Sequence, residues 1–138
     1  MIAHSEWKHG EIYEGTASHG NVIVFDADAK RVHGPSPMEA VLMALCSCSS
    51  VDVVSILQKK RQSLTGLRVT AIATQAPTPP RTFTHIKLTY AVRGQLSRKA
   101  VEDAVSLSKN KYCSVSKMLE KAATIDFEIV YSDGEPEP

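Results

Sequence analysis

Short runs of β-branched and aromatic residues occur between His4 and Phe25, which is a pattern typical of β-strands. The clearest runs cover residues 12–13 and 22–25, and the turn-forming sequence SHGN separates them at 18–21. This part of the chain therefore predicts a meander of short strands. The polar residues that follow, from 26 to 34, predict an exposed loop.

The longest apolar segment covers residues 38–57 and predicts a helix of several turns. Ser36 can cap its first turn, Pro37 suits the first helical position, and Glu39 can complete a capping box. The basic residues at 59–61 complement the negative end of the helix dipole, so we expect the helix to end near Gln62 and Gly66 to stop it.

The second half of the chain predicts two strands, two helices and a last strand. The strands cover 68–74 and 82–92 and flank the proline-rich loop 76–80, Ser97 can cap a helix, and a shorter helix covers 114–122. Apolar residues then alternate at Phe127, Ile129 and Tyr131, and the acidic end 133–138 is expected to be frayed. This order predicts an α+β fold rather than a doubly wound parallel sheet. A helix as apolar as 38–57 needs cover that a second chain can supply, so we expect a homodimer.

Length and composition indicate one soluble domain spanning residues 1–138. The chain has 43% hydrophobic and 22% charged residues, and its formal net charge of +1 offers no field to attract nucleic acid or anionic lipid. The N-terminus lacks the basic and apolar segments of a signal peptide, and Glu39 and Asp52 interrupt the apolar segment, so we expect a cytoplasmic protein without membrane spans. In the cytosol its three cysteines are expected to be free or transiently oxidised.

Cys48 and Cys113 are the residues best suited to chemistry, and each also has a structural interpretation. Cys48 lies in the apolar helix, where burial alone would raise the pKa of its thiol and leave it a packing residue. Cys113 lies at a predicted helix start near Lys109, Lys111 and Lys117, and both features favour a thiolate. Packing at a helix junction is the alternative for Cys113. Spacing alone does not show whether the two cysteines meet.

Two segments resemble the cysteine motifs of the OsmC/Ohr family. Residues 34–48 (GPSPMEAVLMALCSC), followed by 50–54 (SVDVV), resemble the first motif, and residues 111–116 (KYCSVS) resemble the second. Residues 82–86 (TFTHI) resemble the strand between them. The motifs occur in the family's order, and the similarity covers nearly the whole chain. The residues of the two motifs are most similar to those of the YhfA-like branch. The resemblance implies an OsmC-like fold, with antiparallel sheets around a long central helix in an intertwined homodimer.

The resemblance also implies a peroxiredoxin-like organic hydroperoxide reductase that defends against oxidative stress. In the family, one cysteine attacks the O–O bond of a hydroperoxide, a second condenses with the resulting sulfenic acid, and an external dithiol, often a lipoylated protein, reduces the disulfide. Cys48 lies at the family's distance from the motif proline, Pro37, so the resemblance gives Cys48 the attacking role. It gives Cys113, in the second motif, the resolving role and leaves Cys46 as an extra thiol. No bound cofactor or metal is implied.

Three residues are candidates for supporting roles, and each has a structural alternative. The family places a glutamate directly after the motif proline to hold an activating arginine, whereas this chain has Met38 there and Glu39 one residue later. His19 is nearest to the arginine's position but is equally suited to an exposed turn. Asp52 lies one helical turn after Cys48, where it can hold an arginine or water near the thiol or bond to a neighbouring strand.

These departures leave a second function open. A non-catalytic or redox-sensing OsmC-like binding protein would keep the fold without the activating arginine and glutamate. The five histidines show no spacing typical of zinc ligands, so a metal site is not expected.

Overall fold

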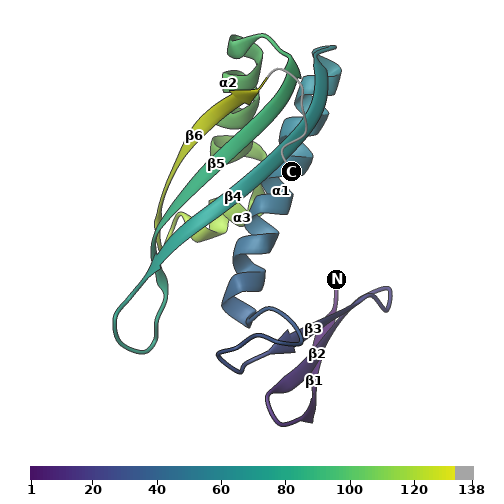
Figure 1. Ribbon diagram of the computed structural model, residues 1–138, viewed down its shortest axis with the longest axis vertical. Helices are drawn as coiled ribbons and strands as arrows, with labels where there is room; N and C mark the ends of the chain where they lie inside the picture. The colour runs from purple at the N-terminus through teal and green to yellow at the C-terminus, as the bar shows by residue number, and fades with distance from the viewer. Residues whose placement is uncertain (133–138) are drawn as a thin grey trace. The chain divides into compact units, whose positions relative to one another are not determined.

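A computed structural model of the chain describes residues 1–132 (Figure 1). In chain order its elements are β1 (Ala3–His9), β2 (Ile12–Ala17), β3 (Val22–Asp26), α1 (Pro37–Lys59), β4 (Ser63–Gln75), β5 (Phe83–Gln95), α2 (Arg98–Leu107), the π-helical turn η1 (Ser108–Tyr112), α3 (Ser114–Leu119) and β6 (Thr124–Ser132). This order confirms the α+β class. The predicted frayed end, 133–138, lies outside the described residues.

The chain divides into two compact units, Met1–Met43 and Ala44–Pro138. In the first unit, β1, β2 and β3 form an antiparallel sheet in sequence order, as the meander prediction requires. The turn between β2 and β3 closes through a hydrogen bond from Ala17 N to Asn21 O, and Gly20 adopts a φ of 87° there. A positive φ of this kind favours glycine, which explains the turn at 18–21.

The start of α1 is the capping box that the sequence predicts. The amide of Glu39 donates to Ser36 Oγ at 3.1 Å, and the amide of Ser36 donates to Glu39 Oε1 at 2.9 Å. These two bonds satisfy amides that have no partner within the helix. Local sequence therefore determines where α1 begins.

The end of α1 differs from the prediction. The helix ends at Lys59, and Arg61 adopts a left-handed φ of 55° while the amide of Gln62 donates back to Leu57 O. Gly66 does not stop the helix but lies within β4, opposite Arg93 of β5. The prediction was wrong because glycine is only the most frequent residue at such a helix end, and Arg61 takes that conformation here.

The second unit contains a three-stranded sheet with the order β4-β5-β6. The long strands β4 and β5 pair antiparallel, but β5 and β6 pair parallel from His85 and Thr124 onwards. The expectation of antiparallel sheets is therefore wrong for this pair. The chain returns to the sheet through α2, η1 and α3, and a helical crossover of this kind is what a parallel pair requires.

The core of the second unit lies between this sheet and the helices (Figure 1). Alternate residues of β5 are fully or almost fully buried, namely Ile86, Leu88, Tyr90 and Val92. Apolar residues of α1 and α2 are equally buried, namely Leu45, Val53, Leu57, Val101, Ala104 and Val105. The opposite face of the sheet carries paired charged side chains, with His85 beside Asp126 at 2.9 Å and Lys87 beside Glu128 at 3.3 Å. The helix side of the sheet is thus the interior of this unit.

Candidate functional site

The thiols of Cys48 and Cys113 lie side by side in the second unit. Cys48 projects from α1 and is half-buried, whereas Cys113 is fully buried at the start of α3. The Cys48 side chain lies close enough to the Cys113 thiol to raise its pKa, and both cysteines are free. Two segments 65 positions apart in the sequence (113 − 48) therefore place these two side chains near each other.

Cys113 occupies the junction between the π-helical turn and α3. Its amide donates to Ser108 O at 2.8 Å, which closes η1, and its sulfur accepts a hydrogen bond from the amide of Ser116 at 3.3 Å. Cys113 thus caps a helix with its side chain, the role that serine or aspartate usually fills. This cap fixes the direction in which the sulfur points.

Burial raises the pKa of the Cys113 thiol to about 11, against the weaker opposing effect of the Ser116 amide. The neighbouring Cys48 and Asp52 raise this pKa further, because negative charge beside a thiol disfavours the thiolate. The sequence predicted a lowered pKa for Cys113, because a helix start and three nearby lysines favour a thiolate. Lys117 instead pairs with Glu120 at 2.6 Å, and Lys111 lies over the ring of Tyr112. Desolvation therefore outweighs the helix start at this thiol.

Cys46 lies in a different environment from Cys48, although only Ser47 separates them. Burial raises the pKa of Cys46, while a hydrogen bond from the backbone amide of Ala71 in β4 lowers it by less. Cys46 is therefore directed toward β4, whereas Cys48 is directed toward Cys113. This difference follows from helix geometry, since positions two apart point in different directions.

Asp52 lies one turn of α1 beyond Cys48 and accepts a hydrogen bond from Ser108 Oγ at 2.9 Å. Its partner is thus the π-helical turn, rather than a neighbouring strand or an arginine. Ser49 Oγ lies 3.1 Å from Ser108 Oγ and 2.5 Å from the hydroxyl of Tyr90. Sequence reasoning missed Ser49, Ser108 and Tyr90, because serine and tyrosine in apolar segments carry no signal of a shared contact.

The other two supporting candidates, Glu39 and His19, belong to the first unit. Glu39 fills its capping-box role, and hydrogen bonds from Ser36 and Arg31 lower its pKa. Arg31 Nε lies 3.1 Å from Glu39 Oε1, so an arginine does meet this glutamate, although it comes from the loop before α1. His19 is exposed in the turn between β2 and β3. Sequence reasoning sought the arginine near His19 and so missed Arg31.

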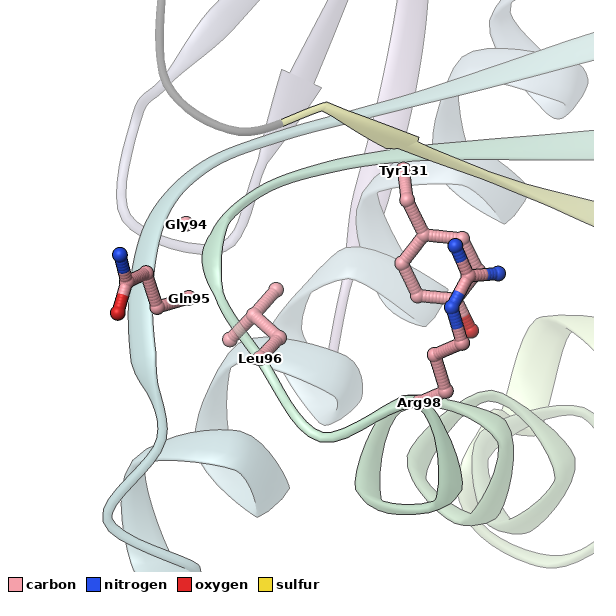
Figure 2. Close-up of a pocket in the computed structure, with 5 residues that line it drawn as sticks. All are labelled: Gly94, Gln95, Leu96, Arg98 and Tyr131. Atoms are coloured by element: carbon pink, nitrogen blue, oxygen red, sulfur yellow. The ribbon is translucent and has the colours of Figure 1, made fainter.

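A separate pocket of about 430 Å³ lies at the start of α2 in the second unit (Figure 2). Gly94, Gln95, Leu96, Arg98 and Tyr131 line it, and the Arg98 guanidinium lies 4.2 Å from the centroid of the Tyr131 ring. The pocket contains none of the candidate residues. Within residues 1–132, no three His, Cys, Asp or Glu side chains form a group that could hold a metal ion. The cysteine pair is therefore the arrangement with the clearest chemical capability.

Comparison with known protein families shows which family this chain belongs to. A family described as OsmC-like protein matches residues 27–128, which is most of the chain. The chain belongs to the OsmC-like protein family. Both cysteines of the pair lie inside the matched segment.

Individual relatives agree with this membership. Protein YhfA of Escherichia coli strain K12 is 44% identical over 133 residues, which cover 94% of this chain and 98% of the relative. The crystal structure of an OsmC like protein from Mycoplasma pneumoniae matches with a TM-score of 0.83 and 13% identity over 94% of this chain and 95% of that one. A structure named as an organic hydroperoxide resistance protein OsmC, from Legionella pneumophila, matches with a TM-score of 0.71 and 16% identity over 94% and 95% of the two chains. The two structures establish an OsmC-like fold.

Family membership also bears on α1. In the part of the chain that the structure describes, α1 is the one helix long and apolar enough to span a membrane. However, the whole of α1 lies inside the segment that matches the family, and its buried residues pack within the second unit. We therefore interpret α1 as a helix of the OsmC-like fold rather than a membrane anchor.

Proposed function

We propose that the protein is a thiol-dependent peroxidase that reduces organic hydroperoxides or hydrogen peroxide in peroxide-stress defence. The proximity of the Cys48 and Cys113 side chains carries the proposal, because a two-cysteine peroxidase needs its two sulfurs close enough to join. Membership of the OsmC-like family supports it, as does the name of the Legionella pneumophila relative.

The environments of the two thiols support a division of roles. Cys113 is fully buried and, with a pKa of about 11, keeps its proton at neutral pH. Its S–H can then donate a hydrogen bond to the sulfur of Cys48, which is the more accessible of the two. Attack on a peroxide therefore falls to Cys48 and resolution to Cys113.

The proposed cycle has three balanced steps. The Cys48 thiolate attacks the peroxide, the O–O bond breaks, and with one proton taken up the products are Cys48 sulfenic acid and an alcohol or water. The Cys113 thiol then displaces the sulfenic oxygen as water and forms the disulfide. An external dithiol, such as a lipoylated protein, reduces the disulfide and is itself oxidised to a disulfide.

The test is peroxide consumption by the purified protein with dihydrolipoamide or dithiothreitol as the reductant. We expect catalytic loss of cumene hydroperoxide or hydrogen peroxide, and a Cys48–Cys113 disulfide in peptide mass spectra after one equivalent of peroxide. Absence of both turnover and disulfide would refute the proposal.

One observation favours a non-catalytic or redox-sensing protein as the second candidate. Met38 stands directly after Pro37, where the family's pattern has the glutamate that holds an activating arginine. A cation beside a thiol is the usual means of stabilising a thiolate. In the same experiment, a stoichiometric disulfide without repeated turnover would identify a sensor.

We also propose that the protein acts as a homodimer in the cytoplasm. Only 22% of the most apolar stretch of α1 is buried within the chain, and Val51 of α1 remains 68% exposed. Burying such a surface against a second copy is favourable at about 25 cal/mol per Å². Sedimentation equilibrium should give twice the 15.0 kDa chain mass, and Val51→Glu should shift the mass toward that of one chain. One chain mass for the wild type at all concentrations would contradict the dimer.

A further inference from the structure

A chain of buried hydroxyl groups joins the two segments that bear the cysteines. Tyr90 of β5, Ser49 of α1 and Ser108 of η1 are each at most 1% exposed, and the chain ends at the carboxylate of Asp52. Successive oxygen–oxygen distances are 2.5 Å from Tyr90 to Ser49, 3.1 Å from Ser49 to Ser108, and 2.9 Å from Ser108 to Asp52. None of these residues belongs to the cysteine pair itself.

The carboxylate fixes the direction of these hydrogen bonds. A carboxylate accepts hydrogen bonds and each hydroxyl has one proton to donate, so Ser108 donates to Asp52, Ser49 to Ser108, and Tyr90 to Ser49. Hydrogen bonds that follow one another in this way strengthen each other in a buried environment. The chain is therefore a single connected unit.

Ser108 connects this chain to the backbone that carries Cys113. Its carbonyl accepts the hydrogen bond from the Cys113 amide at 2.8 Å, and it is the first residue of the π-helical turn. A single π-helical turn is rare in proteins and is frequently found at functional sites. On the other side, Ser49 directly follows Cys48 and Asp52 lies one turn beyond it. The hydroxyl of Ser108 is thus hydrogen-bonded to residues of α1 beside Cys48, and its carbonyl accepts a hydrogen bond from the amide of Cys113.

We propose that Asp52, Ser108 and Ser49 are positioning residues, here called the latch, that hold Cys113 at the distance from Cys48 that disulfide formation needs. A disulfide forms only when the two Cα atoms lie within about 7 Å and the Cβ atoms point toward each other, so a small shift of η1 is enough to separate the sulfurs. The inference rests on the proposed function in one respect, since it takes Cys48 and Cys113 as the reacting pair.

The test is the equilibrium of the protein with a glutathione redox buffer. One oxidised glutathione converts the dithiol protein into its Cys48–Cys113 disulfide and yields two reduced glutathiones, and the equilibrium constant measures the effective concentration of one thiol near the other. For Ser108→Ala and Asp52→Ala we expect this effective concentration to fall about tenfold or more, because small misplacements of reacting groups have effects of this size. Asp52→Asn keeps an oxygen that can accept from Ser108 and should stay within about threefold of the wild type.

Ser106→Ala is the matched control. Ser106 lies in α2 just before the π-helical turn and accepts a hydrogen bond from Asn110 Nδ2 at 3.2 Å, so its loss removes a nearby serine hydroxyl without touching α1. This variant should keep the wild-type effective concentration. Unfolding midpoints of the reduced proteins should be measured in parallel, since a purely structural role would lower the midpoint and leave the effective concentration unchanged. Should Ser108→Ala fail to fold, Asp52→Ala and Ser49→Ala provide the same readout.

The glutathione equilibrium requires no peroxide, so the latch and the proposed function can fail separately. Wild-type effective concentrations in Ser108→Ala and Asp52→Ala would overturn the latch even in an active peroxidase. A fall in these variants would support the latch even if the protein consumed no peroxide.

Discussion

Cys48→Ser is expected to lower peroxide turnover by about a thousandfold or more, because a serine hydroxyl cannot replace a thiolate as the nucleophile. Initial rates of cumene hydroperoxide consumption with dihydrolipoamide as the reductant provide the measurement. The half-buried position of Cys48 limits side effects on folding, and circular dichroism of the variant should match that of the wild type. Full turnover by Cys48→Ser would remove this residue from the attacking role.

Cys46→Ser is the matched control for this variant. Cys46 lies on the same helix, but it is directed toward Ala71 of β4 and not toward Cys113. We expect its turnover to stay within about twofold of the wild type, the range of a substitution outside the reacting groups. If Cys46→Ser lost activity and Cys48→Ser kept it, the family-based assignment would be reversed.

Local sequence predicted the elements whose causes are local. The capping box of Ser36 and Glu39 and the turn at 18–21 depend on neighbouring residues only, and both occur as expected. The parallel pairing of β5 and β6 is set by a crossover through three helical segments, which joins strands that lie far apart in the sequence. Such long-range features have no local pattern in the sequence.

The candidate site shows the same limit. The motifs around Cys48 and Cys113 could be recognised by resemblance, yet burial reverses the pKa shift that the lysines near Cys113 suggested. The contact between Ser108 and Asp52 joins residues 56 positions apart, and serine has no spacing rule that predicts such a contact. Burial and long-range contacts arise only from the folded chain.

The buried hydroxyl chain and the buried thiol act on the same step of the proposed cycle. The Cys113 thiol must approach the Cys48 sulfenic acid and lose its proton there. The latch positions the Cys113 thiol for this approach, whereas the raised pKa of Cys113 determines how readily the thiol loses its proton. Formation of the disulfide is therefore the step most sensitive to this part of the structure.

Cys113→Ser is expected to stop multiple turnover while leaving the first attack on peroxide intact. Without a resolving thiol, Cys48 sulfenic acid persists and can be oxidised further to sulfinic acid. A stoichiometric peroxide titration should therefore consume about one equivalent, and turnover supported by a dithiol should fall by about a hundredfold or more. Trapping the sulfenic acid with dimedone and locating it by mass spectrometry identifies the attacking residue. A label on Cys46, or undiminished turnover, would contradict the assigned pair.

The pH dependence of disulfide formation in the wild type tests the role of Cys113 without a substitution. The folded pKa of about 11 lies above the ordinary thiol value of 9.0, so the thiolate fraction at Cys113 is small at neutral pH. This fraction rises about tenfold for each pH unit below the pKa, and a thiolate is the reacting species. In stopped-flow experiments, the rate of disulfide formation after sulfenic acid formation should therefore increase steadily from pH 7 to pH 9. A rate independent of pH over this range would show that resolution does not depend on ionisation of the buried Cys113 thiol.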